Sequence, residues 1–127
     1  MQSVLFTPTF ERQAKAAGLS DEELQEIASV LARDPLAGDL MEGTGGARKV
    51  RFARPGAGKS GGYRTIHYFG GDDVPVFLLA LVDKGARANL SKAERNELAK
   101  VLPRIAAAYR EDSAARITAL ARRKKGE

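Results

Sequence analysis

The sequence predicts an α+β fold: a small antiparallel sheet with an N-terminal helical hairpin packed on one face, followed by a C-terminal helix. Three observations lead to this class. Helix-start and helix-stop signals fill the first 35 residues, a period-two alternation begins at residue 48, and a helix-start signal returns at residue 91. With 127 residues, the chain is long enough for one domain with a substantial core.

The N-terminal part reads as a short apolar strand at residues 3–6 followed by two helices. Thr7 is the predicted N-cap of the first helix, because the proline after it suits the first helical position. Gly18 is the predicted end of this helix, since glycine accepts the left-handed C-cap conformation. Ser20 and the glutamate three residues later predict a capping box for the second helix, which an Asp-Pro pair stops at residues 34–35.

The middle of the chain has the pattern of antiparallel strands. The alternation from residue 48 places Lys49 and Arg51 on one face of a strand and apolar residues on the other. The connections that follow are too short for helical crossovers, which favours a meander. After the strand that begins at residue 48, the predicted elements are a glycine-rich loop at 55–62, a strand at 63–69, a turn at 70–73 and a buried strand at 74–84.

The C-terminal helix is predicted from a second capping box that opens at Ser91. Apolar residues such as Leu102 recur on one face of this helix. Pro103 lies inside the pattern, so we expect it to kink the helix or to split it. We place the folded domain at residues 1–110 and treat residues 111–127 as a basic helical extension or tail.

Composition excludes several classes of function. The chain has no cysteine, which rules out disulfides, thiolate metal sites and cysteine nucleophiles, and its single histidine disfavours a histidine-based metal centre. We therefore expect no metal and no cofactor. No apolar run reaches transmembrane length and the start lacks the pattern of a secretory signal, so we expect a cytoplasmic protein that binds no membrane.

The net charge of +5 is unevenly divided along the chain. Residues 1–42 carry three basic and eight acidic residues, whereas residues 43–127 carry 18 basic and eight acidic residues. The segment from Gly43 to Gly71 holds six basic residues and no acid. Such an unneutralised segment is suited to a phosphate backbone or another polyanion.

Basic residues of the predicted strands gather on one face. Lys49, Arg51 and Arg64 are expected to converge there, with Lys84 at the end of the next strand. One interpretation is an ordinary solvated face. However, like charges opposite each other destabilise paired strands, so their retention favours an anionic ligand.

The Gly58-Lys59-Ser60 stretch is weak support for a nucleotide-binding loop. The full motif needs a glycine where Ala53 stands, and a helix after the loop, but a strand is predicted there. A hairpin loop rich in glycine is the favoured interpretation.

Two further features each have two interpretations. His67 is the only side chain that ordinarily titrates near neutral pH, so it is a candidate general base. Alternation places it opposite Arg64, toward the helices, which favours a packed structural histidine. The Arg122–Lys125 cluster is either an RNA contact or, as we favour, a helix end whose cations suit the helix dipole.

The segments from Gly45 to Arg54 and from Gly58 to Tyr68 resemble the centre of the RelE/ParE toxin superfamily. The long glycine loop makes the chain similar to the HigB-type branch, and the GKSGGxR stretch is the most specific part. The resemblance extends from Val4 to about Leu102. It implies a RelE-like fold, in which two helices cover one face of an antiparallel sheet.

The resemblance also implies an activity and partners. It implies a toxin of a type II toxin–antitoxin system that cleaves mRNA in the ribosomal A site as a metal-independent endoribonuclease. Its partners would be the ribosome with its mRNA and a cognate antitoxin of the HigA-like helix-turn-helix type. Operator DNA would be bound only through the antitoxin complex. In the implied reaction a ribose 2′-OH attacks the adjacent phosphorus, and cations stabilise the dianionic transition state.

Site residues follow from the resemblance position by position. Arg64 corresponds to the arginine that contacts the scissile phosphate. Some relatives carry a catalytic tyrosine or histidine after the last strand, and residues 83–89 offer neither, so the general base stays open. A lysine beside other cations is one candidate. The predicted catalytic residues are Arg64, Lys84, Lys49, Arg51 and Lys59, and the predicted RNA-binding residues are Arg48, Arg54, Arg87 and Tyr63.

Two other functions stay open at this point. The first is a ParE-like gyrase poison on the same fold, which would have no evident need for clustered phosphate contacts. The second is a non-catalytic RNA-binding module, which would be expected to show stacking aromatic residues on its sheet. The strands offer only Tyr63 and Tyr68 for that purpose.

Overall fold

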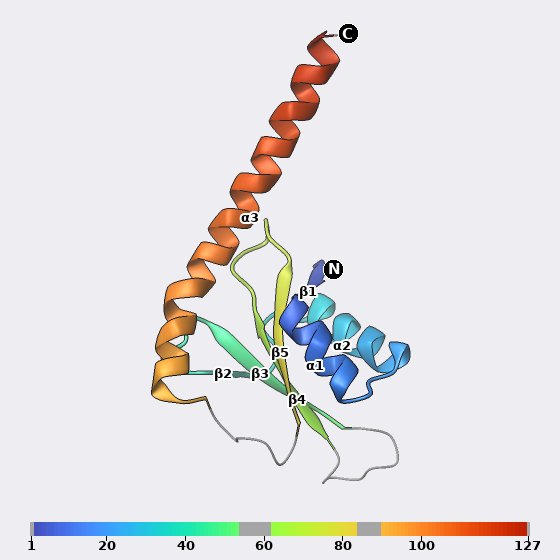
Figure 1. Cartoon of the computed structure of the whole chain (residues 1–127), viewed down its shortest axis with the longest axis vertical. Helices are drawn as coiled ribbons and strands as arrows, with labels where there is room; N and C mark the ends of the chain where they lie inside the picture. Colours follow the sequence, from blue (N-terminus) through green and yellow to red (C-terminus); the bar gives the residue numbers. More distant parts are fainter. Residues whose placement is uncertain (1, 54–61, 84–89, 127) are drawn as a thin grey trace.

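The computed structural model describes residues 2–53, 62–83 and 90–126, with side chains except those of Asp83 and residues 114–126. One five-stranded sheet has the order β1-β5-β4-β3-β2, with α1 and α2 beside it on one side and α3 on the other (Figure 1). The elements are β1 (Val4–Phe6), α1 (Pro8–Ala16), α2 (Asp21–Arg33), β2 (Asp39–Leu40), β3 (Ala47–Phe52), β4 (Tyr63–Tyr68), β5 (Val76–Asp83) and α3 (Lys92–Gly126).

The N-terminal helical hairpin forms as its capping residues predict. The Thr7 hydroxyl accepts a hydrogen bond from the Phe10 backbone N–H at 3.3 Å and donates to the carbonyl of Leu78 at 2.9 Å. It therefore caps α1 and also ties the start of α1 to β5. Ser20 and Glu23 form the reciprocal capping box, with both hydrogen bonds at 3.1 Å.

The sheet is mixed and not purely antiparallel, so the predicted topology was wrong in one respect. β1 pairs in parallel with β5, with Val4 opposite Val76 and Phe6 opposite Leu78, while β2, β3, β4 and β5 pair antiparallel in turn. Short turns dictate antiparallel pairing only for strands that they join directly. β1 reaches β5 through the rest of the chain, and this long connection permits the parallel orientation.

The face of the sheet under α1 and α2 holds the larger core. Phe10, Ile27 and Leu31 from the helices are fully buried and belong to one cluster with Leu78 and Leu81 of β5. Burial of each such side chain contributes roughly 1.5–3 kcal/mol, which makes this layer the main source of stability.

The opposite face is partly covered by α3. The sequence predicted this helix but not its position on the sheet. Leu102 of α3 is fully buried against Ala47 of β3 and Ile66 of β4. A register shift beside Ile66 leaves Leu79 between paired residues of β5, and both Leu79 and Ala80 pack against this second cluster. The face that carries Lys49 and Arg51 of β3 therefore also has an apolar part, and α3 occupies it.

α3 remains one helix of 35 residues, so the predicted split at Pro103 was wrong. Pro103 is exposed, while Leu98 and Leu102 before it and Ile105 after it pack in the cluster with the sheet, so packing holds the helix on both sides of the proline. Arg110 also fixes the helix through Asp73, with Nε–Oδ2 at 2.6 Å and Nη2–Oδ1 at 2.9 Å. Within the described parts of the chain, no helix has the length and apolar character needed to cross a membrane.

We predict that Gly38→Ala destabilises the fold far more than Gly18→Ala. Both glycines have positive φ, 82° and 73°, so alanine costs about 1–2 kcal/mol of backbone strain at either. A Cβ at Gly38 would also overlap the backbone carbonyl of Lys49, whereas nothing lies within 4 Å of one at Gly18. The total cost at Gly38 is then about 3 kcal/mol or more. Urea unfolding measures both variants, and equal losses would contradict the steric argument.

Candidate functional site

Three cations converge on the α3 side of the sheet. Arg51 of β3 lies directly opposite Arg64 of β4, and Lys49, two residues along β3, pairs with Ile66. Residues two apart on a strand share a face, so all three cations lie on the same side, as the alternation predicted. Arg51 is exposed, while Lys49 and Arg64 are half-buried.

The described strand neighbours of the Arg51–Arg64 pair suit an anionic ligand. The described strand residues that adjoin the arginines on this face are Lys49, Ile66 and Val82, and none of them is acidic. Two cations about 5 Å apart repel by roughly 1 kcal/mol in water and more in a less polar setting. A phosphate bound between the two cations is attracted to each of them. A guanidinium group can also form two parallel hydrogen bonds with phosphate oxygens.

Four of the predicted site residues, Lys59, Arg54, Lys84 and Arg87, lie outside the described residues. The strands nevertheless show where their segments attach to the sheet. Phe52 ends β3, Tyr63 begins β4 and Asp83 ends β5, and these three residues are aligned in register, one position beyond the level of the arginine pair. The segments 54–61 and 84–89, which contain these four residues, therefore attach at the end of the sheet that carries Arg51 and Arg64.

Arg48 and Tyr63 lie on the other face of the sheet, so they do not join the cation cluster. The Arg48 guanidinium donates to the carbonyls of Leu36 at 3.1 Å and Gly38 at 3.3 Å, which holds the connection between α2 and β2. The Tyr63 ring is only 2% exposed and stacks on Phe52, with ring centroids 6.0 Å apart. A ring enclosed in the core has no face open to a base, which argues against the prediction that Tyr63 binds RNA.

His67 is a packed residue, as the favoured interpretation held. Its side chain is fully buried on the face opposite Arg64, and Nε2 lies 2.9 Å from the carbonyl oxygen of Pro35. A carbonyl only accepts, so Nε2 carries the proton, while Nδ1 is buried without a hydrogen-bond partner. Burial lowers the pKa of His67, and the nearby Arg48 lowers it further, against the opposing effects of the Pro35 hydrogen bond and of Asp34.

Gln13 supports the site from a position that sequence patterns did not single out. β1 ends at Phe6, so the outer edge of β5 continues beyond its partner strand. There the Leu81 backbone N–H donates to Oε1 of Gln13 at 2.8 Å. This hydrogen bond holds β5 one residue before Val82, which pairs with Arg64. A glutamine on the polar side of a helix gives no sequence signal of this role.

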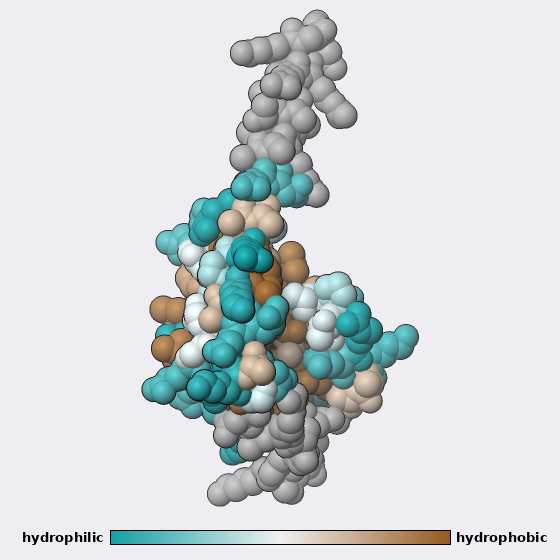
Figure 2. Space-filling view, turned by 60° about the vertical axis from the view of Figure 1, so that its left-hand side comes forward, coloured by the Kyte–Doolittle hydropathy of each residue, from teal (hydrophilic) through white to brown (hydrophobic). Residues whose placement is uncertain are grey.

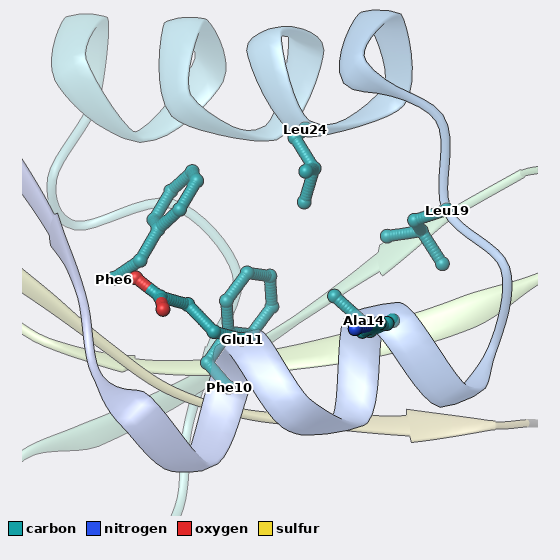
Figure 3. A pocket seen from close by; sticks show the side chains of 7 residues that line it. Phe6, Phe10, Glu11, Ala14, Leu19 and Leu24 are labelled. Atoms are coloured by element: carbon teal, nitrogen blue, oxygen red, sulfur yellow. The ribbon is translucent and has the colours of Figure 1, made fainter.

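A pocket between α1 and α2 lies on the face of the sheet opposite the cation cluster (Figure 3). Its volume is about 230 Å³, below the usual range of small-molecule sites. Phe6, Phe10, Leu19 and Leu24 contribute apolar side chains to its walls. Glu11 and Lys15 are the charged residues that line it. Because the pocket is small and lies on the face away from the cation cluster, we do not assign the activity to it.

The described residues offer no set of side chains suited to bind a metal ion. No group of three or more histidine, cysteine, aspartate or glutamate side chains in that part of the chain is placed to hold an ion. The described site is thus a cationic, anion-attracting surface next to two chain segments that enter and leave the sheet.

The family of this chain follows from its match to a model of a known protein family. Residues 2–125 match the family described as RelE toxin of the RelE / RelB toxin-antitoxin system. The chain belongs to the RelE toxin family.

As a RelE-family toxin, the protein belongs to a toxin–antitoxin system, so an antitoxin is the partner that family membership implies. Among solved structures, a doubly substituted mutant of the E. coli toxin RelE in the free state is similar at 20% sequence identity. The match covers 65% of this chain and 83% of that chain, with a TM-score of 0.45. The helices and the five-stranded sheet of the structure itself confirm the predicted α+β class. The HigB-type branch stays a prediction from the glycine loop.

We predict that the toxin loses stability as the pH falls below 6.5, the ordinary pKa of histidine. The folded state binds the His67 proton less readily than the unfolded chain does. The contribution of neutral His67 to the free energy of unfolding is therefore complete above pH 6.5, and it is lost as the pH falls toward the lowered pKa. Urea unfolding between about pH 7.5 and 5.5 measures this, because most carboxylates titrate below that window. His67→Gln should flatten the curve, and an unchanged slope in that variant would contradict the assignment.

Proposed function

We propose that this RelE-family toxin is a metal-independent endoribonuclease that cleaves mRNA in the ribosomal A site. The observation that carries the proposal is the register pairing of Arg51 with Arg64, with Lys49 on the same face. The proposal includes a cognate antitoxin of the HigA-like helix-turn-helix type and contact with operator DNA only through that complex.

The proposed reaction uses these cations to stabilise charge. A ribose 2′-OH attacks the adjacent phosphorus, the P–O bond to the 5′ oxygen breaks, and a cyclic phosphate and a free 5′-OH result. Arg64 contacts the scissile phosphate, while Arg51 and Lys49 neutralise the negative charge that grows on its oxygens. Groups already oriented toward that charge often supply the largest share of catalysis. Lys84 and Lys59 are proposed to complete the catalytic site, with Arg54 and Arg87 as further RNA contacts.

Dependence on the ribosome follows from what the described cationic face contains. The described residues of β3 and β4 on this face include no histidine, aspartate or glutamate to serve as a strong base. Cations alone bind RNA but do not align the 2′-OH with the leaving oxygen. Alignment of reacting groups contributes several kcal/mol to a rate, and the ribosome is the proposed source of it.

We predict that Arg64→Ala abolishes growth arrest and lowers single-turnover cleavage on programmed ribosomes by about 100-fold or more, since it removes a transition-state contact. Arg33→Ala is the matched control, because Arg33 is an exposed arginine in the last turn of α2. Circular dichroism checks that both variants fold. A folded Arg64→Ala variant with full toxicity would show that the site is assigned wrongly.

We also predict that the wild-type toxin cuts mRNA on ribosomes in the presence of a chelator that does not dissociate them, and that it leaves naked RNA largely intact. Chemistry driven by positioned cations needs no metal. Cleavage mapping of one transcript, free and ribosome-bound, measures both statements. Rapid cutting of naked RNA, or ribosome-free cutting that appears only with added divalent metal, contradicts the mechanism. Toxicity that follows gyrase inhibition would favour the ParE-like alternative.

A further inference from the structure

The C-terminal end of α3 carries a second concentration of positive charge. Residues 113–126, called here the C-terminal arm, contain five basic residues and no acid. The net charge of the arm equals that of the entire chain, +5. The sequence pattern alone favoured a helix end whose cations suit the helix dipole, but cations interact with that dipole only within the last turn. Arg116 lies well before that turn, so the dipole does not account for it.

The backbone extends this charge away from the domain. Among the described side chains, those near the end of α3 that hold it to the sheet are Tyr109, whose ring meets Phe77 edge-on at 6.0 Å, and Arg110, which pairs with Asp73. α3 continues as a helix to Gly126, and Figure 1 shows its C-terminal part standing clear of the sheet and of α1 and α2. Figure 2 shows hydrophilic surface on the outward side of the described part of α3.

The arm and the arginine pair lie at opposite ends of the molecule. Arg64 is near the start of β4, whereas Arg110 reaches the carbonyl of Gly70, just beyond the end of β4. The strand from Arg64 to Tyr68 covers about 13 Å. The helix from Ser113 to Lys125 adds about 18 Å beyond that end. The two cationic regions are therefore tens of ångströms apart, farther than the screening length of roughly 8 Å at physiological salt.

We propose that the C-terminal arm is a second RNA-binding element, which contacts the phosphate backbone of ribosomal RNA while the arginine pair holds the messenger. This inference rests on the proposed function. A short single strand at the arginine pair does not span both regions, whereas a structured polyanion of ribosomal size presents phosphates to both. Contacts of this kind are independent of sequence and strengthen as counterions are released.

The charge on the rest of the surface supports this orientation. The N-terminal 42 residues, which include α1 and α2, carry eight acidic and three basic residues. RNA repels that part of the molecule, so the hairpin turns outward when both cationic regions engage. The arm thereby adds affinity for the ribosome and also limits the ways in which the toxin approaches it.

The test is a full-length toxin in which Arg122, Arg123, Lys124 and Lys125 are replaced by glutamine, which preserves helix propensity. The matched control replaces the three basic residues of α1 and α2, Arg12, Lys15 and Arg33, by glutamine. Binding to empty ribosomes and to a short single-stranded RNA is measured over a range of salt concentrations.

The arm variant should lower the slope of log affinity against log salt on ribosomes by roughly two to four, about one for each lost phosphate contact. Its slope on short RNA should stay at the wild-type value. The control variant should change neither slope. On programmed ribosomes, the arm variant should raise KM and leave kcat unchanged, because Arg64 and Arg51 are intact.

Three outcomes overturn the proposal: an unchanged ribosome slope, an equal loss on short RNA, or a loss of neutralisation by the antitoxin with ribosome binding intact. The last would make the arm a protein-binding element. Failure of the proposed function is seen separately, because the wild-type toxin would then leave mRNA on programmed ribosomes uncut, whatever the arm variant does.

Discussion

The backbone hydrogen bonds between β3 and β4 are the constraint on which the rest depends. Their register sets Arg51 against Arg64 on one face and Arg48 against His67 on the other. A shift of one residue would exchange the two faces, placing the arginine pair in the apolar core. The same pairing that stabilises the sheet thus separates its charged groups into a cation cluster and a buried, hydrogen-bonded layer. The register between β3 and β4 therefore determines both the core and the position of the basic site.

Helices hold that register from both sides. Phe10, Ile27 and Leu31 press on one face, while Leu102 packs on the other. Because side chains of helices pack on both faces, the strands have limited freedom to slide relative to one another. The arginines on β3 and β4 are fixed on a rigid platform, and this suits a mechanism that relies on charge held in place before the substrate arrives.

Local chemistry made part of this architecture predictable. Thr7 and Ser20 cap helices through atoms within three residues, and the alternation of Lys49 and Arg51 fixes their face without knowledge of the fold. Long-range choices were not predictable. The parallel pairing of β1 with β5, and the docking of α3 on the cationic side, depend on which apolar surfaces meet in three dimensions. The prediction that Tyr63 binds RNA did not take account of its strand parity, which places the ring in the core.

Both edges of the sheet are unusually short. β1 has three residues and β2 has two, so neither offers a long row of free backbone groups to another chain. Where β5 extends past β1, the side chain of Gln13 occupies the Leu81 N–H that an incoming strand would use. The two described edge strands therefore give a strand from another copy little to pair with. Edge strands this short lower the chance that sheets join through their edges.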